Sequence, residues 1–186
     1  LGQQAYFLAN LLIPLAVAAF LVGSVVAIFE RDLKRMLGYS SVAQIGYIVL
    51  AIALASSAGL TAAIVHFLNH ALMKAALFTA VAGIMLRYGT TNLDQLAGLG
   101  RRMPLTMLGF VFGGLSLIGV PLTAGFISKW YLIQAVLEEP GLGILLTMLI
   151  LLASLMAVVY IWKVVEVAYF KAPANGSLQD IKREEA

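Results

Sequence analysis

The run Thr61–Met85, TAAIVHFLNHALMKAALFTAVAGIM, is apolar for most of its length but carries both histidines of the chain and a lysine. These side chains, His66, His70 and Lys74, are four residues apart each time. On an α-helix four residues is slightly more than one turn, so each side chain is rotated by only about 40° from the one before. The sequence therefore predicts one stripe of titratable groups along a long helix, with Asn69 beside it.

The composition places this helix in a membrane protein. Of the 186 residues, 62% are hydrophobic and 11% are charged, whereas soluble domains have about 25% charged residues. A chain of this composition is a polytopic integral membrane protein. The net charge of +3 is no sign of nucleic-acid binding, because the basic residues stand at the ends of apolar segments.

The residue inventory argues against most kinds of catalytic and metal site. Cysteine is absent, which rules out disulfides, thiolate metal sites and cysteine-bound iron–sulfur clusters. The two histidines share one predicted helix with no carboxylate nearby in sequence, so we expect no metal and no cofactor. The GxGxxG, P-loop, GxSxG and HExxH motifs are missing. The chain shows no catalytic chemistry of its own, although it could serve as a subunit of a redox-driven proton translocase.

Apolar segments long enough to cross a hydrocarbon core, which takes roughly 20 helical residues, follow one another along the chain. They cover residues 8–29, 39–56, 60–86, 104–137 and 142–170. We therefore predict an all-α fold with five transmembrane helices over residues 1–170. A short polar tail at 171–186 follows them.

The basic residues between these segments set the predicted orientation. The connections that contain lysine and arginine are ERDLKR, RYGTTNLDQLAGLGRRM and KAPANGSLQDIKREEA, whereas SSAGL is uncharged and EEPG is acidic. All loop lysines and arginines therefore fall on one side, which the positive-inside rule makes cytoplasmic. We expect the N-terminus outside and the C-terminus cytoplasmic, in a bacterial inner (plasma) membrane.

The fourth segment is much longer than one span needs and holds IGVPLTAGFISKW at its middle. Gly119 and Pro121 weaken a helix there, and Gly125 adds a second weak point. Broken spans of this kind mark binding or translocation sites in transporters, although an ordinary proline kink would leave the same pattern. Lys129, shortly after the break, favours the broken span.

Lys74 and Lys129 both fall inside predicted spans, where a lysine costs about 2.5–3.5 kcal/mol on insertion scales. Histidine changes charge near neutral pH. Two lysines with His66 and His70 therefore form a candidate for a proton relay. The alternative is that these side chains are structural and paired within the helix bundle.

Four polar residues near the start of the second span offer a candidate cytoplasmic path to this relay. Ser40, Ser41 and Gln44 could line a wet route, although small-residue helix packing explains the serines equally well. Lys34, in ERDLKR, could belong to the route or act only as a topology anchor. Lys163 and Glu166, near the end of the last span, are expected to form an interfacial pair.

Three stretches resemble, in this order and spacing, the antiporter-like subunits of respiratory complex I and of multisubunit cation/proton antiporters. They are RDLKRMLGYSSVAQIGY, HFLNHALMKAALF and GVPLTAGFISKWYL. Those subunits are built around two inverted five-helix repeats. The resemblance implies that this chain corresponds to the second repeat of a longer protein, including its broken helix.

The resemblance also implies roles for single residues. Lys129 corresponds to the broken-helix charge that carries protons toward an outer half-channel. His66 and His70 correspond to the central relay, with Lys74 next along it, and Lys34 matches the lysine of the family's DxKR stretch. Within the family, FISKWYL and FLNHALMK look most like the D-type subunit of the cation/proton antiporters.

From these observations we predict proton translocation as part of a multisubunit monovalent cation/proton antiporter. The alternative is a proton-pumping subunit of a respiratory NADH:quinone oxidoreductase or a related redox-driven complex. A second alternative, a membrane scaffold that transports nothing, does not explain the buried lysines. Other membrane subunits, protons, and sodium or another monovalent cation are the expected partners.

Overall fold

The computed structural model describes the backbone of residues 2–171 and the side chains of residues 9–171. This part of the chain is almost entirely helical, and its only β-type pairing is an isolated bridge between Asp32 and Asn92. The predicted all-α class is therefore confirmed. Most of the predicted tail at 171–186 lies outside the described residues.

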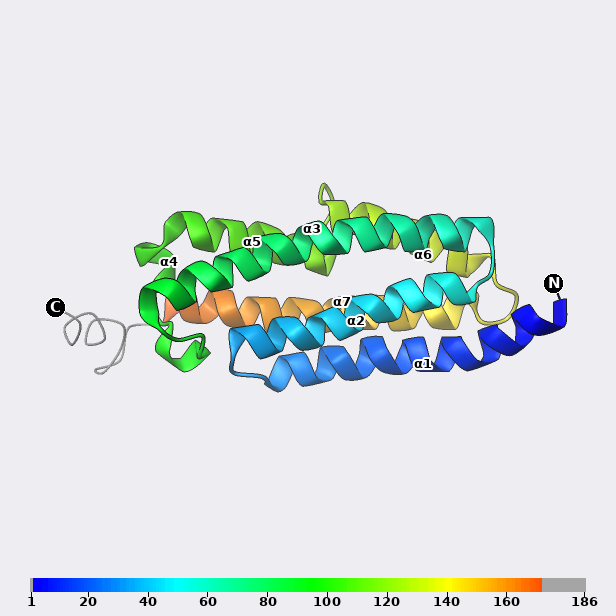
Figure 1. Ribbon diagram of the computed structural model, residues 1–186, viewed down its shortest axis with the longest axis horizontal. Helices are drawn as coiled ribbons and strands as arrows, with labels where there is room; N and C mark the ends of the chain where they lie inside the picture. The colour runs from blue at the N-terminus through cyan, green and yellow to red at the C-terminus, as the bar shows by residue number, and fades with distance from the viewer. Residues whose placement is uncertain (1, 172–186) are drawn as a thin grey trace.

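Long helices run side by side along an elongated bundle (Figure 1). They are α1 (Gly2–Phe29), α2 (Leu33–Ala53), α3 (Ser57–Tyr88), α5 (Pro104–Ile118), α6 (Ala124–Leu137) and α7 (Gly143–Val165). Short turns of helix, η1 (Leu93–Gln95), α4 (Leu99–Arg102) and the π-helical η2 (Glu166–Phe170), lie at the end of the bundle that holds the α1–α2 turn. We call this the basic end, because the loops with lysine and arginine gather there.

Four of the five predicted spans coincide with helices that are long and apolar enough to cross a membrane. Apolar helices long enough to cross a membrane cover Ala9–Phe29, Leu33–Ala53, Ser57–Tyr88 and Gly143–Phe170. In Figure 1, α5 and α6 follow each other along the length of α3, so together they occupy the predicted fourth span, residues 104–137. The second span begins at Leu33 rather than at residue 39, because Asp32 caps the helix by accepting a 3.1 Å hydrogen bond from the N–H of Arg35.

The break in the fourth span ends α5 with a Schellman motif at Gly119, which has a φ of +90°. The N–H of Val120 bonds to the carbonyl of Leu115 and the N–H of Gly119 to that of Ser116, both at 3.1 Å. Thr123 then caps α6 by accepting a 3.4 Å bond from the N–H of Phe126. The predicted break at Gly119–Pro121 is therefore confirmed.

Gly125 has a different role from the one expected. It does not weaken a helix, because it is the second residue of α6 and lies buried against α5. A Cβ atom at Gly125 would overlap the carbonyl oxygen of Ser116, and the Gly125 N–H donates a 3.0 Å bond to the Ser116 hydroxyl. The glycine therefore allows the two half-helices to meet backbone to backbone.

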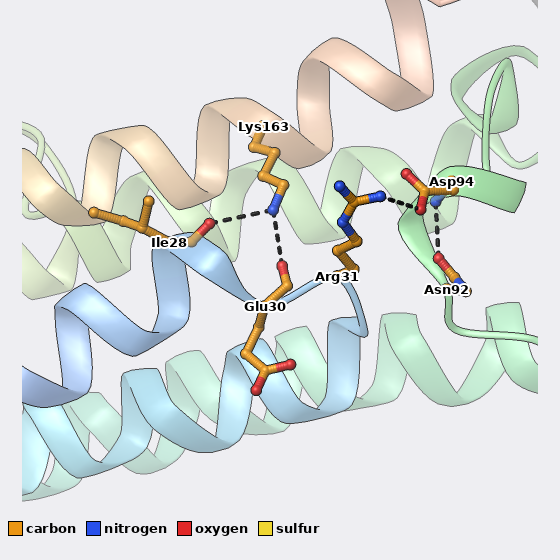
Figure 2. A network of polar contacts seen from close by, with 6 residues as sticks. All are labelled: Ile28, Glu30, Arg31, Asn92, Asp94 and Lys163. Atoms are coloured by element: carbon orange, nitrogen blue, oxygen red, sulfur yellow. Dashed lines mark hydrogen bonds and ion pairs between the residues drawn. The ribbon is translucent and has the colours of Figure 1, made fainter.

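At the basic end, the connection after α3 docks on the α1–α2 turn (Figure 2). The Arg31 guanidinium and the Asp94 carboxylate are 3.0 Å apart, and the N–H of Leu93 donates a 2.8 Å bond to the Arg31 carbonyl. Asp32 also accepts a short hydrogen bond from the Thr91 hydroxyl. These contacts hold the start of α2 in place.

Asp32 is ionised more easily than an ordinary aspartate. Partial burial pushes its pKa up, but hydrogen bonds from Thr91 and from the N–H groups of Arg35 and Lys34, together with the Lys34 charge, outweigh burial. The pKa of Asp32 therefore lies below its usual value.

Lys163 does not form the expected interfacial pair with Glu166. Its ammonium donates to the carbonyls of Ile28, at 3.2 Å, and Glu30, at 2.9 Å, and so satisfies the C-terminal end of α1 (Figure 2). Glu166 lies 3.7 Å from Lys171 instead.

The buried apolar residues form two clusters, and the boundary between them crosses α2, α3 and α7, whereas α5 belongs to one cluster and α6 to the other. On α2 the division falls between Leu37 and Ala43, on α3 between Ala63 and Met73, and on α7 between Ala153 and Ala157. Polar side chains occupy these intervals, among them Ser40, His66, His70 and Ser154. The candidate site therefore lies at the seam between two halves of the core.

Candidate functional site

Lys129 lies on α6 and points back to the end of α5. Its ammonium donates to the carbonyls of Leu117, at 3.1 Å, and Ile118, at 2.8 Å, and to the Ser154 hydroxyl of α7, at 2.9 Å. The side chain is only 6% exposed. The ammonium also lies 5.2 Å from the ring centre of Tyr47, within range of a cation–π contact.

These bonds complete the hydrogen bonding at the end of α5. A helix leaves its last four carbonyls without intrahelical partners, and the Schellman motif uses those of Leu115 and Ser116. Lys129 takes the remaining two, on Leu117 and Ile118, and its charge faces the negative end of the helix dipole. The broken helix therefore creates the site that holds the lysine.

Lys74 lies on α3 and is held by the neighbouring helix α2. Its ammonium donates to the Leu37 carbonyl at 2.6 Å and to the Ser40 hydroxyl at 2.5 Å. The hydroxyls of Ser40 and Ser41 donate to the same carbonyl, at 2.9 and 3.0 Å. The predicted residues Ser40 and Ser41 thus belong to the Lys74 site.

The two buried lysines lack carboxylate partners in the part of the chain that the structure describes. The ion pairs found there are Arg31–Asp94, Arg35–Glu30 and Lys171–Glu166, all in connections or at helix ends. Each buried ammonium is held instead by carbonyl and hydroxyl oxygens. These oxygens are neutral. If a lysine releases its proton, the resulting neutral amine therefore leaves no unpaired carboxylate charge in the bundle.

His66 lies between the lysines and bonds to α6. Its Nδ1 atom is 2.9 Å from the Ser128 hydroxyl, which donates a 3.1 Å bond to the Gly125 carbonyl. Since that serine proton is committed to the carbonyl, the geometry favours Nδ1–H of His66 as the donor. Nε2 of His66 is then the basic nitrogen, and it has no hydrogen-bond partner among the described residues.

His70 continues the stripe toward Lys74. The two imidazole rings are nearly parallel, at 8°, with their centres 6.5 Å apart. Nδ1 of His70 is buried and, like Nε2 of His66, unpartnered within the described part of the chain. Asn69 lies outside this line and donates a 2.8 Å bond to the Ala124 carbonyl.

Gln44 and Lys34 have different positions relative to this cluster. Gln44 is 1% exposed, and its Oε1 atom has no partner among the described residues. It is one helical turn beyond Ser40 on α2, and the antiparallel α2–α3 pairing sets it level with the stripe. Lys34 is exposed in the first turn of α2 and lines a surface groove beside Phe78, so the fold does not bring it into the buried cluster.

The sequence interpretation missed several side chains that complete the site. Ser128 and Ser154 each bond to a predicted residue, and Tyr47 packs edge-on against His66 with the ring centres 5.7 Å apart. Only Tyr47 left a signal, since Ser40, Gln44 and Tyr47 repeat at helical spacing. A cavity of about 110 Å³ lies beside Lys129, between α5, α6 and α7.

Comparisons with known proteins identify relatives of this chain. Residues 3–159 match the family model for "NADH:quinone oxidoreductase/Mrp antiporter, TM". The chain is 45% identical over 157 residues to the NADH-quinone oxidoreductase subunit N of Desulforudis audaxviator (strain MP104C), a match that covers 84% of this chain and 31% of that relative.

Solved structures share the fold as well. A chain of the Mrp complex from Dietzia sp. DQ12-45-1b matches with a TM-score of 0.84 and 33% identity, over 89% of this chain and 31% of that one. A chain of the membrane-bound sulfane sulfur reductase, an archaeal respiratory membrane complex, matches with a TM-score of 0.83 and 32% identity, over 96% of this chain and 38% of that one. The chain spans about a third of the length of these relatives. The family inferred from the three sequence motifs is confirmed: this integral membrane chain belongs to the transmembrane family shared by NADH:quinone oxidoreductase and the Mrp antiporter.

Proposed function

We propose that this chain forms part of a proton path in a membrane subunit of a redox-driven quinone oxidoreductase complex. In this proposal Lys74 and Lys129 hold protons, and His66 and His70 pass protons between them. Other membrane subunits of the complex and the remainder of the full-length subunit complete the path. The basic end faces the cytoplasm, as the positive-inside rule predicts.

The observation that carries the proposal is the pair of buried lysines without carboxylate partners in the described part of the chain. A buried ammonium is costly in a membrane protein, and ionisable side chains inside a span mark ion or proton pathways by default. Here each ammonium belongs to a lysine that is 6–7% exposed and is held by neutral oxygens. Such a site tolerates both charge states, which is what a proton carrier needs.

The identity of the relatives favours a redox-driven complex. The chain is 45% identical to NADH-quinone oxidoreductase subunit N and 33% identical to the matching chain of the Mrp complex. The sequence motifs looked most like the D-type antiporter subunit, but the higher sequence identity to subunit N favours a redox-driven complex. Cation/proton antiport remains the second candidate, because the same fold and the same family include the Mrp complex.

The test is made in the full-length subunit, assembled in its native membranes. Proton uptake by inverted vesicles is measured with a pH-sensitive dye and divided by the rate of electron-donor oxidation. We expect Lys74→Met and Lys129→Met each to abolish dye-detected uptake while leaving the complex assembled. Normal uptake in both variants would contradict the proposal.

The same vesicles separate the two candidates. A redox-driven pump acidifies the lumen only when an electron donor and a quinone are supplied, and added sodium changes nothing. An antiporter dissipates an imposed pH gradient when sodium or another monovalent cation is added, with no electron donor present. Cation-driven dissipation that depends on Lys129 would replace the first candidate with the second.

A further inference from the structure

A groove of about 470 Å³ runs over the surface of the bundle between the start of α2 and the last turns of α3. Its lining residues are Lys34, Phe78, Val81, Ala82, Met85 and Leu86. Lys34 is the only charged residue among them, and the others, all on α3, are apolar. The proton path proposed above does not pass through this groove.

Lys34 stands at the end of the groove that lies nearest the basic end of the bundle. It belongs to the first turn of α2, and the N–H of Leu33 beside it donates a 2.9 Å bond to the Thr91 carbonyl in the connection after α3. From Leu86 to Phe78 the groove follows α3 toward the middle of the bundle for about 12 Å, at 1.5 Å per residue. The groove therefore has one positively charged end and an apolar length.

The exposed Lys34 ammonium has no ion-pair partner in the part of the chain that the structure describes. The neighbouring carboxylate of Asp32 accepts hydrogen bonds from the Thr91 hydroxyl and from the N–H of Arg35 instead. A lysine in the first turn of a helix also faces the positive end of the helix dipole, so its charge does not stabilise α2. This end of the groove therefore favours an anionic group from outside the described chain.

The apolar part of the groove fits an acyl chain better than a protein helix. Helix–helix contacts in membranes favour small residues, which let the two backbones approach closely. Here the rim consists of large side chains, since Leu86 is 89% exposed and Met85 and Phe78 are each 39% exposed. Only Ala82 is small, and the buried Val81 lies at the floor.

We propose that this groove binds one anionic phospholipid, with its phosphate against Lys34 and an acyl chain along α3. Basic sites at the cytoplasmic surface of a membrane attract anionic headgroups, and the positive-inside rule places the basic end there. A lipid without net charge gains less from the lysine, although it fills the apolar length equally well. The binding itself does not depend on the proposed function.

The inner end of the groove meets the Lys74 site. Phe78 lines the groove, and its ring centre lies 5.7 Å from the Lys74 ammonium, within range of a cation–π contact. An acyl chain packed on this ring holds the ring over the ammonium and keeps water away from it. The phospholipid should therefore support pumping, and this consequence rests on the proposed function.

The binding test uses the full-length subunit in its assembled complex, in phosphatidylcholine vesicles with a small amount of a phospholipid whose acyl chain is photoreactive. This probe is phosphatidylglycerol in one set of vesicles and phosphatidylcholine in the other, and labelled peptides are mapped by mass spectrometry. We expect about fivefold more labelling of residues 78–86 by phosphatidylglycerol, equivalent to about 1 kcal/mol for one lysine at an anionic surface. Lys34→Glu should remove this preference. Arg101→Glu, the same charge change at an exposed position of the basic end outside the groove, should keep it.

A second variant fills the groove and leaves Lys34 in place. Ala82→Phe should lower the labelling of residues 78–86 by both probes, whereas Ala76→Phe, at an exposed position of α3 outside the groove, should not. Pumping is then measured as the ratio of proton uptake to electron-donor oxidation while unlabelled phosphatidylglycerol is added. The ratio should rise in the wild type and stay constant in Lys34→Glu and Ala82→Phe.

The outcomes separate this inference from the proposed function. Equal labelling by the two probes, or a preference that survives Lys34→Glu, would overturn the phospholipid site. Absence of labelling at residues 78–86 would show that another protein segment covers the groove, and would overturn the site as well. Pumping that ignores phosphatidylglycerol in a wild type that binds it would refute the connection to Lys74. The proposed function fails on a different result, normal pumping in both Lys74→Met and Lys129→Met, which has no bearing on the labelling.

Discussion

Lys129 of α6 donates a 2.8 Å hydrogen bond to the carbonyl oxygen of Ile118, the last residue of α5. The residue that resembles the family's proton carrier is thus also the group that closes the end of the broken helix. A change of charge at Lys129 must alter the hydrogen bonding of the break, because a neutral amine has fewer protons to donate to its oxygen partners. This connection between titration and helix geometry can be tested by substitution.

Arginine and methionine at position 129 should separate the structural contribution of this residue from its proton chemistry. Lys129→Arg keeps a charge and donors for the carbonyls of Leu117 and Ile118 but cannot release its proton in a protein. We expect it to assemble into the complex with pumping lost. Lys129→Met should lose pumping and also about 1–3 kcal/mol of stability, because buried carbonyls are left unpaired.

Dye-detected proton uptake and thermal unfolding of the purified complex measure these effects. Lys163→Met is the matched control, since Lys163 also donates to helix-terminal carbonyls but lies outside the buried cluster. It should lower stability while the uptake ratio of the remaining complex stays normal. Full pumping by Lys129→Arg would show that this lysine does not need to deprotonate.

Gly125→Ala should prevent α5 and α6 from meeting. The added Cβ would overlap the Ser116 carbonyl oxygen, which belongs to rigid helix backbone. Overpacking of this kind costs about 1–3 kcal/mol or more, so we expect poor assembly and a lowered unfolding temperature. Gly109→Ala is the control, because nothing lies within 4 Å of a Cβ placed there. Alanine at Gly109 should be neutral or stabilise α5 by up to about 1 kcal/mol.

Single cysteines should report the orientation, because the sequence contains no native cysteine. Ser57 begins α3, Pro140 lies in the α6–α7 connection and Gln95 belongs to η1 at the basic end, and all three are exposed. The α2–α3 and α6–α7 connections lie at the end of the bundle opposite the basic end (Figure 1). An impermeant thiol reagent added outside intact cells should label Ser57→Cys and Pro140→Cys. It should label Gln95→Cys only after the membrane is opened. The opposite labelling pattern would reverse the proposed direction of the path.

Asp32 should make stability depend on pH in the acidic range. Its pKa is lowered in the folded protein, so its stabilising contribution is fully present above the unfolded-state pKa of about 3.9. The contribution is lost as the pH falls through the lower, folded-state pKa. Thermal unfolding of the wild type and of Asp32→Asn should therefore differ most near neutral pH and converge at acidic pH. A difference that grows on acidification would contradict this assignment.

The fold could be predicted from local sequence features because each depends on short-range physics. Apolar length sets the spans, the i, i+4 spacing places His66, His70 and Lys74 on one face of α3, and Gly119 with Pro121 ends a helix. The family could be identified from the sequence too, since its three motifs keep their order and spacing. The predicted start of a helix was less accurate where the capping residue lies outside the apolar run, as Asp32 does at the start of α2.

The partners of the predicted residues were decided only by the tertiary structure. No local pattern states that Lys129 turns back to the carbonyls of α5, that Ser40 of α2 holds Lys74 of α3, or that Gly125 is a point of contact rather than of weakness. Ser154 reads in the sequence as one more small residue of an apolar span, and its bond to Lys129 depends on how α7 packs against α6. Residue chemistry and helical period, both present in the sequence, determine which groups can carry protons, whereas the distances between those groups arise from helix packing over long separations in the chain.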